Sequence, residues 1–123
     1  MEAERAIPMT SDCIFCKIAA GELPATIRYE DEDIVAFEDL NPQAPHHLLI
    51  VPRKHIRTTL DLTTADNQLI GHIFQVAGKL AHDLGFAEDG FRVVNNCNEA
   101  GGQAVWHVHF HLLGGRDLTW PPG

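Results

Sequence analysis

Three histidines alternate with apolar residues near the end of the 123-residue chain. His107, His109 and His111 are spaced two residues apart within the run 105–113. Side chains of a β-strand point alternately to its two faces, so the three imidazoles are expected to share one face of a strand. Trp106 and its even-numbered neighbours are expected to share the other, apolar face.

This histidine run has three interpretations. It could be the polar face of a half-buried strand without chemical function, or it could chelate a catalytic metal ion. It could also perform imidazole chemistry on phosphorus, in which one ring attacks and its neighbours serve as acid, base or charge stabiliser. The third interpretation is favoured because a Gly-Gly pair in residues 100–103 comes just before the run. Backbone amides of such a segment can hold an anion.

A second group of residues suited to chemistry lies near the start of the chain. Cys13 and Cys16 have the Cys-x-x-Cys spacing of half a zinc site. Two further ligands would be needed, and His55 and His107 are the candidates, which would give a closed, structural site. A redox pair or two unliganded thiols are the alternatives. The remaining cysteine, Cys97, stands alone and is given no function.

The composition excludes several classes of protein. The net charge is −8, which argues against binding of DNA or RNA but not against binding of a small nucleotide. No apolar run approaches the roughly 18 residues of a membrane span, and residues 1–12 lack the apolar stretch of a signal peptide. The three cysteines then indicate a reducing compartment, and we expect a cytoplasmic protein whose residues 1–12 form a flexible leader.

The elements that must position these residues can be predicted from apolar periodicity and turn residues. We expect an α+β domain with a mainly antiparallel sheet, one long helix and a short N-terminal helix. The short helix spans 13–20, capped by Ser11 or Asp12, and the long helix runs from a Thr63 cap to Gly85. Strands are expected at 27–30, 34–38, 48–51, 91–95 and 105–113.

Several separated motifs together resemble a known family. The run His-Val-His-Phe-His-Leu-Leu at 107–113 matches the histidine triad signature, and Gly-Gly-Gln precedes it as Gly-Gly-Arg follows it. Residues 37–45 and the Trp-Pro-Pro-Gly ending at 120–123 match as well. The chain resembles the histidine triad (HIT) family, in particular its nucleotide-binding (HINT) branch, and the resemblance covers 13–123 as one HIT domain.

The resemblance implies a fold and an activity. Members of this branch are homodimers that bind purine nucleotides and hydrolyse purine nucleoside 5′-phosphoramidates, including nucleotidyl-lysine, to nucleoside monophosphates. The reaction passes through a nucleotidyl-histidine intermediate. From the residues themselves no Mg²⁺ is expected, since the chain has no P-loop motif and no cluster of acidic residues near the three histidines. Two other activities are expected as alternatives: hydrolysis or nucleotidyl transfer on dinucleoside polyphosphates, and a non-catalytic nucleotide-binding scaffold. The expected location is the cytoplasm, and for a eukaryotic source the nucleus stays open as a second location.

The resemblance also assigns residues, each by its place in the matching motifs. His109 is the nucleophile, His111 contacts the phosphate and assists the leaving group, and His47 supports them, while the adjacent His46 faces solvent. Asp39 binds the ribose hydroxyls. The base pocket matches Ile14, Phe15, Ile18, Leu23, Phe37 and Leu40, and the phosphate and sugar contacts match Asn96, Gly102 and Gln103. The structural zinc ligands match Cys13, Cys16, His55 and His107. Ala104 stands where the branch usually has a serine that bonds the phosphate or leaving group.

Overall fold

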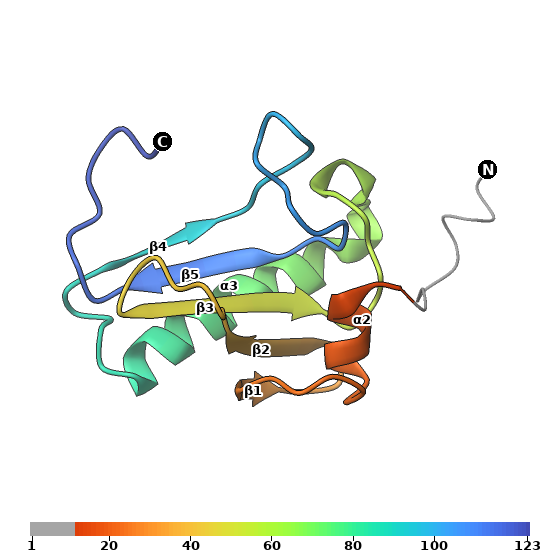
Figure 1. The fold of residues 1–123 in the computed structure, drawn as a ribbon, viewed down its shortest axis with the longest axis horizontal. Helices are drawn as coiled ribbons and strands as arrows, with labels where there is room; N and C mark the ends of the chain where they lie inside the picture. Colours follow the sequence, from red (N-terminus) through yellow and green to blue (C-terminus); the bar gives the residue numbers. More distant parts are fainter. Residues whose placement is uncertain (1–11) are drawn as a thin grey trace.

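The computed structural model describes residues 12–123, so most of the predicted leader lies outside the described residues. A five-stranded antiparallel sheet forms the centre of the fold, in the order β1-β2-β3-β5-β4. Its strands are β1 (Ile27–Glu30), β2 (Ile34–Glu38), β3 (His46–Pro52), β4 (Phe91–Val94) and β5 (Phe110–Gly114). The long helix α3 (Asn67–Asp83) lies across one face, and the short helix α2 (Ile14–Ala19) lies beside β2 and β3 (Figure 1). The predicted fold class is confirmed.

The two central strands β2 and β3 are buried on both faces. In β2, Ile34 and Ala36 pack in the cluster that includes α3, whereas Val35 and Phe37 pack with Phe15 of α2. A strand that is covered on both sides reads as a continuous apolar run instead of an alternating one. This explains the apolar stretch after His47, and it places the predicted pocket between α2 and the sheet.

The long helix begins close to its predicted cap. The side chain of Thr63 accepts from Ala65 N–H, and Asp66 accepts from Thr63 N–H, which closes a capping box on the 3₁₀ turn η2 (Thr64–Asp66). The α-helical part then starts at Asn67, and an earlier 3₁₀ turn, η1 (Thr59–Asp61), precedes it. The buried face of α3 consists of Ile73, Val76, Ala77, Leu80 and Ala81. Gly85 ends the helix with a φ of +87°.

The histidine run departs from its predicted strand. β5 begins at Phe110, five residues later than expected, because the chain bends at 105–107 and is irregular at 108–109. Trp106 is 38% exposed and does not join the apolar core. Its ring lies under the guanidinium of Arg57, whose Cζ is 4.4 Å from the ring centre. From Val108 onward the alternation holds, and the even-numbered residues are buried against α3.

Two smaller expectations are also corrected. The cap of α2 is Cys13, whose sulfur accepts from Cys16 N–H at 3.4 Å, instead of Ser11 or Asp12. His46 is half-buried and stacks on Phe86 with ring centres 4.5 Å apart, so it does not simply face solvent. Within residues 12–123, no helix is both long and apolar enough to cross a membrane.

Candidate active site and metal centre

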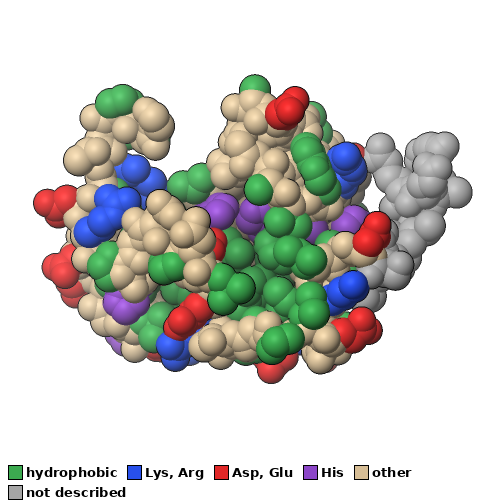
Figure 2. All heavy atoms as spheres, in the orientation of Figure 1, with side chains coloured by type: hydrophobic (Ala, Val, Ile, Leu, Met, Phe, Trp, Pro, Cys, Tyr) green, Lys and Arg blue, Asp and Glu red, His purple; other side chains and the backbone are tan. Residues whose placement is uncertain are grey.

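Two of the three histidines line a cavity of about 270 Å³ on the sheet face that carries α2. His109 and His111 lie at its edge, and the walls are largely apolar. The lining comprises Ile14, Phe15, Ile18, Pro24, Ala25, Phe37, Glu38, Asp39, Leu40, Leu49, Ala104, Val105, His109 and His111. Figure 2 shows this face, with the apolar centre below a row of histidines. An apolar slot with a few polar groups at one end suits a flat heterocycle with a charged substituent.

The ring of His109 is held in one tautomer by the backbone. Its Nδ1 lies 2.8 Å from the carbonyl oxygen of His107, and a carbonyl can only accept, so Nδ1 carries the proton. Nε2 therefore keeps its lone pair. Burial lowers the pKa of His109, which favours the neutral ring, and the edge contact with Phe15 at 5.1 Å between ring centres restrains its orientation. A buried, neutral imidazole with a free Nε2 has the properties of a nucleophile.

His111 is held in a defined tautomer by a chain of two hydrogen bonds. The N–H of Gln43 donates to Nδ1 of His47 at 3.0 Å, so the proton of His47 is on Nε2. That Nε2–H donates to Nδ1 of His111 at 2.9 Å, which leaves the proton of His111 on its own Nε2. Burial and the neighbouring rings of His109 and His47 lower the pKa of His111 to about 4. His111 thus provides a neutral N–H donor beside the lone pair of His109.

Asp39 closes the other side of this histidine pair. Its Oδ2 lies 3.4 Å from His47 Nε2, and its Oδ1 accepts from the N–H of Asn41 at 2.8 Å. Burial lowers the pKa of His47, and the charge of Asp39 partly opposes that effect. Asp39 also lines the cavity, where its carboxylate can accept from hydroxyl groups of a ligand.

Most of the residues that the sequence places in the nucleotide site line the cavity, but four do not. Leu23 is 37% exposed, and its neighbours Pro24 and Ala25 take the place expected for it. Asn96, Gly102 and Gln103 belong to the loop above the cavity and are not part of its wall.

The amides of the Gly-Gly loop are used within the loop itself. Gly101 N–H and Gln103 N–H donate to Asn98 O at 3.2 and 3.1 Å, and Gly102 N–H donates to Glu99 O at 3.0 Å. These three groups therefore do not form the anion-binding nest that we expected, because the turn satisfies its own donors.

Gln103 has a structural role in the same loop. Its amide group donates to Arg57 O at 2.9 Å and to Val105 O at 3.0 Å, and its Oε1 accepts from Asn98 N–H at 2.9 Å. The next residue, Ala104, is exposed and lines the cavity, and its N–H has no acceptor within residues 12–123. Among the amides of 101–104, the N–H of Ala104 is thus the one that the loop leaves without an acceptor.

One polar residue of the site was missed in the sequence. Asn95 donates from Nδ2 to the carbonyl of His109 at 2.9 Å, and its Oδ1 accepts from the hydroxyl of Thr59. Asn95 therefore fixes the main chain of the residue whose ring lines the cavity. The sequence signal was an Asn-Asn pair at the end of a strand, and the first asparagine, not Asn96, is the one that contacts the histidine segment.

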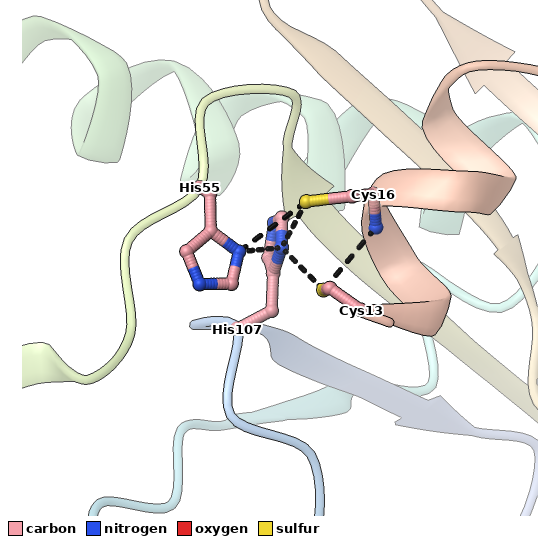
Figure 3. Close-up of side chains that lie close together, drawn as sticks. All are labelled: Cys13, Cys16, His55 and His107. Atoms are coloured by element: carbon pink, nitrogen blue, oxygen red, sulfur yellow. Dashed lines mark hydrogen bonds between the residues drawn. The ribbon is translucent and has the colours of Figure 1, made fainter. Parts of the chain in front are cut away.

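The third histidine, His107, turns away from the cavity toward a different group. It lies with Cys13, Cys16 and His55 (Figure 3), and the ligand atoms of these four residues are all within 4.8 Å of one another. Cys13 Sγ and Cys16 Sγ lie 3.3 and 3.6 Å from His107 Nδ1. His55 Nδ1 lies 3.3 Å from Cys16 Sγ and 3.2 Å from His107 Nδ1.

These distances fit a tetrahedral zinc ion. Zn–N and Zn–S bonds of about 2.0 and 2.3 Å give tetrahedron edges of roughly 3.3 Å between nitrogens and 3.5 Å between nitrogen and sulfur. The other ring nitrogen of His107, Nε2, donates to Pro52 O at 2.8 Å, so Nδ1 presents its lone pair to the cluster. The two cysteines are not joined by a disulfide, and four donors leave no open position. Two thiols and two imidazoles at these distances could hold one zinc ion without a position for a further ligand.

The chain is similar to known proteins over most of its length. The HIT domain family matches residues 20–118. The purine nucleoside phosphoramidase of Escherichia coli (strain K12) is 46% identical over 110 residues, which are 89% of this chain and 92% of that protein. A HIT family hydrolase from Legionella pneumophila is 55% identical, with a TM-score of 0.90 over 91% of this chain and 100% of the other. A histidine triad protein from Clostridium difficile is 49% identical, with a TM-score of 0.88 over 90% and 96% of the two chains.

Proposed function

The chain belongs to the HIT family, and from this premise we propose that it hydrolyses purine nucleoside 5′-phosphoramidates at the α-phosphate. The observation that carries the proposal is the pairing of His109 and His111 at one edge of the apolar cavity. His109 offers a lone pair on Nε2 and His111 offers an N–H on its Nε2. The name of the Escherichia coli relative supports the phosphoramidate substrate and the purine base.

In the proposed first step, Nε2 of His109 attacks the α-phosphorus and the P–N bond of the substrate breaks. The amine leaves with a proton taken from solvent. The His109 ring then carries a positive charge, which its Nδ1–H shares through the hydrogen bond to His107 O. The N–H groups of His111 and Ala104 stabilise the charge on the phosphoryl oxygens.

In the second step, water attacks phosphorus and the bond between phosphorus and His109 breaks. The proton of the water is released to solvent, and a nucleoside monophosphate and the neutral histidine are restored. Asp39 binds the ribose hydroxyls, and the cavity walls contributed by α2 and β2 hold the base. This scheme uses only histidines, backbone amides and one carboxylate, so no Mg²⁺ is part of it.

We propose that Cys13, Cys16, His55 and His107 hold a structural zinc ion, because their donor atoms all lie within 4.8 Å of one another. Bound there, zinc would hold the N-terminus of α2 against the segment before β5. No catalytic step passes through this ion.

We also propose that the protein is a homodimer. β4 is an edge strand of the sheet, and within residues 12–123 only β5 pairs with it. Phe91 at its start and Phe74 on α3 are 39% and 52% exposed. Light scattering after size exclusion tests this assignment, and a monomer at micromolar concentration would contradict it.

Phosphorus NMR of adenosine 5′-phosphoramidate with the purified protein tests the activity. We expect conversion to AMP at a constant rate. Binding of AMP without any conversion would favour the non-catalytic scaffold instead. Faster hydrolysis of diadenosine polyphosphate than of the phosphoramidate would favour the alternative activity on dinucleoside polyphosphates.

A further inference from the structure

The tautomer of His111 depends on a backbone amide in an exposed loop. Gln43 N–H donates to His47 Nδ1 and thereby determines that His47 donates, and His111 accepts, in the bond between them. If the amide moved away, only the longer contact of Asp39 Oδ2 at 3.4 Å would favour the proton on Nε2 of His47, and either ring nitrogen could carry it. His111 could then present a lone pair to the cavity instead of an N–H. The position of Gln43 therefore matters for the proposed phosphate contact.

Gln43 lies in the irregular segment between β2 and β3, and its side chain is exposed. Within this segment its side-chain amide donates to Asn41 O at 3.0 Å. The contact that ties it to a distant part of the chain comes from Arg116, whose Nε–H donates to Gln43 O at 3.0 Å. Arg116 Nη1 also donates to Asp117 O at 2.9 Å, which orients the guanidinium group.

The chain just before Arg116 is packed closely against the same loop. Gly115 has a φ of +93°, a conformation that favours glycine. A Cβ atom added there would lie 2.9 Å from Pro45 Cβ and 3.2 Å from His46 Cδ2. Gly115 therefore lets the C-terminal segment lie directly on the loop and brings the Arg116 guanidinium to Gln43.

We infer that Arg116 is a positioning residue for His111, acting through the main chain of Gln43 and the ring of His47. Arg116 binds the carbonyl of Gln43 and so restrains the main chain next to the peptide group whose N–H is directed to His47, which maintains the N–H of His111 toward the cavity. This inference rests on the proposed function for its effect on turnover. Its effect on the histidine tautomers can be measured without any substrate.

The first test is nitrogen NMR of the imidazole rings in the protein without ligand. In the wild type we expect both His47 and His111 to carry the proton on Nε2. Arg116→Ala should convert His47 to a mixture of tautomers, and Arg116→Lys should restore most of the wild-type pattern because an ammonium group can still donate to Gln43 O. Wild-type tautomers in Arg116→Ala would overturn the inference, whatever the activity of the enzyme.

Arg92→Ala is the matched control. Arg92 also donates from its guanidinium to backbone carbonyls of the C-terminal segment, Leu118 O at 3.2 Å and Thr119 O at 2.8 Å, but it has no bond to the loop around Gln43. If Arg92→Ala disturbs the His47 tautomer as much as Arg116→Ala does, the effect comes from a loosened C-terminal segment and the inference is wrong. An unchanged tautomer in Arg92→Ala supports it.

The second test separates kcat from KM. Loss of one well-placed donor should lower kcat for adenosine 5′-phosphoramidate about tenfold in Arg116→Ala, with the affinity for AMP changed less than twofold. A fall in affinity with unchanged kcat would overturn the inference. If the wild type itself releases no AMP, the proposed function fails, and the tautomer measurement still decides the role of Arg116.

Discussion

The carbonyl oxygen of His107 accepts the Nδ1–H of His109 at 2.8 Å, so one residue links the cysteine–histidine cluster to the cavity. Its ring faces the two cysteines and His55, and its main chain fixes the tautomer of the ring that lines the cavity. A backbone carbonyl carries no charge and cannot take up the proton of its partner. Its hydrogen bond favours protonation of His109, but burial has the larger and opposite effect and lowers the pKa of this ring, which suits a nucleophile that must be neutral near pH 7.

This relationship predicts a covalent adduct on one defined ring. During turnover of adenosine 5′-phosphoramidate, intact mass spectrometry of acid-free quenched samples should detect one nucleotidyl group per chain, and peptide mapping should locate it on His109. His109→Ala should form no adduct and lose at least 10³-fold in turnover, since removal of a nucleophile abolishes the covalent route. It should still bind AMP. An adduct on His111 or His47 would contradict the assignment.

The metal cluster predicts about one zinc ion per chain in protein purified without chelator. His55→Ala should abolish stoichiometric zinc and lower the melting temperature by several degrees, because a structural zinc contributes directly to folding free energy. Cys97→Ser is the control, since that thiol lies outside the cluster. Zinc content should be measured by elemental analysis, and a wild-type protein free of metal would refute the assignment.

The pKa of His111, lowered to about 4, predicts how pH affects this ring. The charges facing it are those of His109, His47 and Asp39. An unfolded chain protonates this histidine near pH 6.5, whereas the folded protein does not, so the unfolded state binds one more proton between the two values. Stability should therefore fall as pH decreases from 6.5 to 4, with this ring contributing up to about 1.4 kcal/mol per pH unit.

Proton NMR of the His111 ring measures this shift directly. Its resonances should not move between pH 8 and 5.5, while free imidazole in the same tube titrates as an internal reference. His111→Gln should reduce the pH dependence of the free energy of unfolding over the same interval, measured by urea denaturation. A titration midpoint near the ordinary histidine value would contradict the structure.

The sequence predicted the parts of the fold that follow from local periodicity. The bounds of β1 and β2 agree with those expected, and α3 begins just after the capping box at Thr63, because alternation, helical spacing and capping are properties of neighbouring residues. The start of β5 was predicted too early. The bend before Phe110 arises from contacts with distant residues, such as Val108 N–H with Ile56 O at 2.6 Å, and these leave no local signal.

The site was predicted in composition better than in detail. The bond between His47 and His111 joins residues 64 positions apart, and it depends on the pairing of β3 with β5, where His47 lies opposite Leu113. The amide of Gly102 could bond either to its own turn or to a ligand, and the sequence of a Gly-Gly loop is the same in both cases. Such choices are made by tertiary geometry, so they could not be read from spacing alone.

Gly114 gives a prediction about stability at the end of β5. A Cβ atom there would lie 2.6 Å from Cε1 of Phe86, whose ring is buried and stacked on His46. Because the Phe86 ring is packed between Gly114 and His46, Gly114→Ala must displace it. This should lower the free energy of unfolding by about 1–3 kcal/mol.

Gly78→Ala is the matched control, because Gly78 lies inside α3 and an added Cβ would meet no atom within 4 Å. This change should raise stability by about 0.5–1 kcal/mol, since alanine is the better helix former. Urea denaturation of both variants measures the two effects with opposite signs. Equal stability of Gly114→Ala and the wild type would mean that the Phe86 ring has room to move. The packing of the end of β5 on Phe86, which stacks on His46 of β3, would then be looser than the structure indicates.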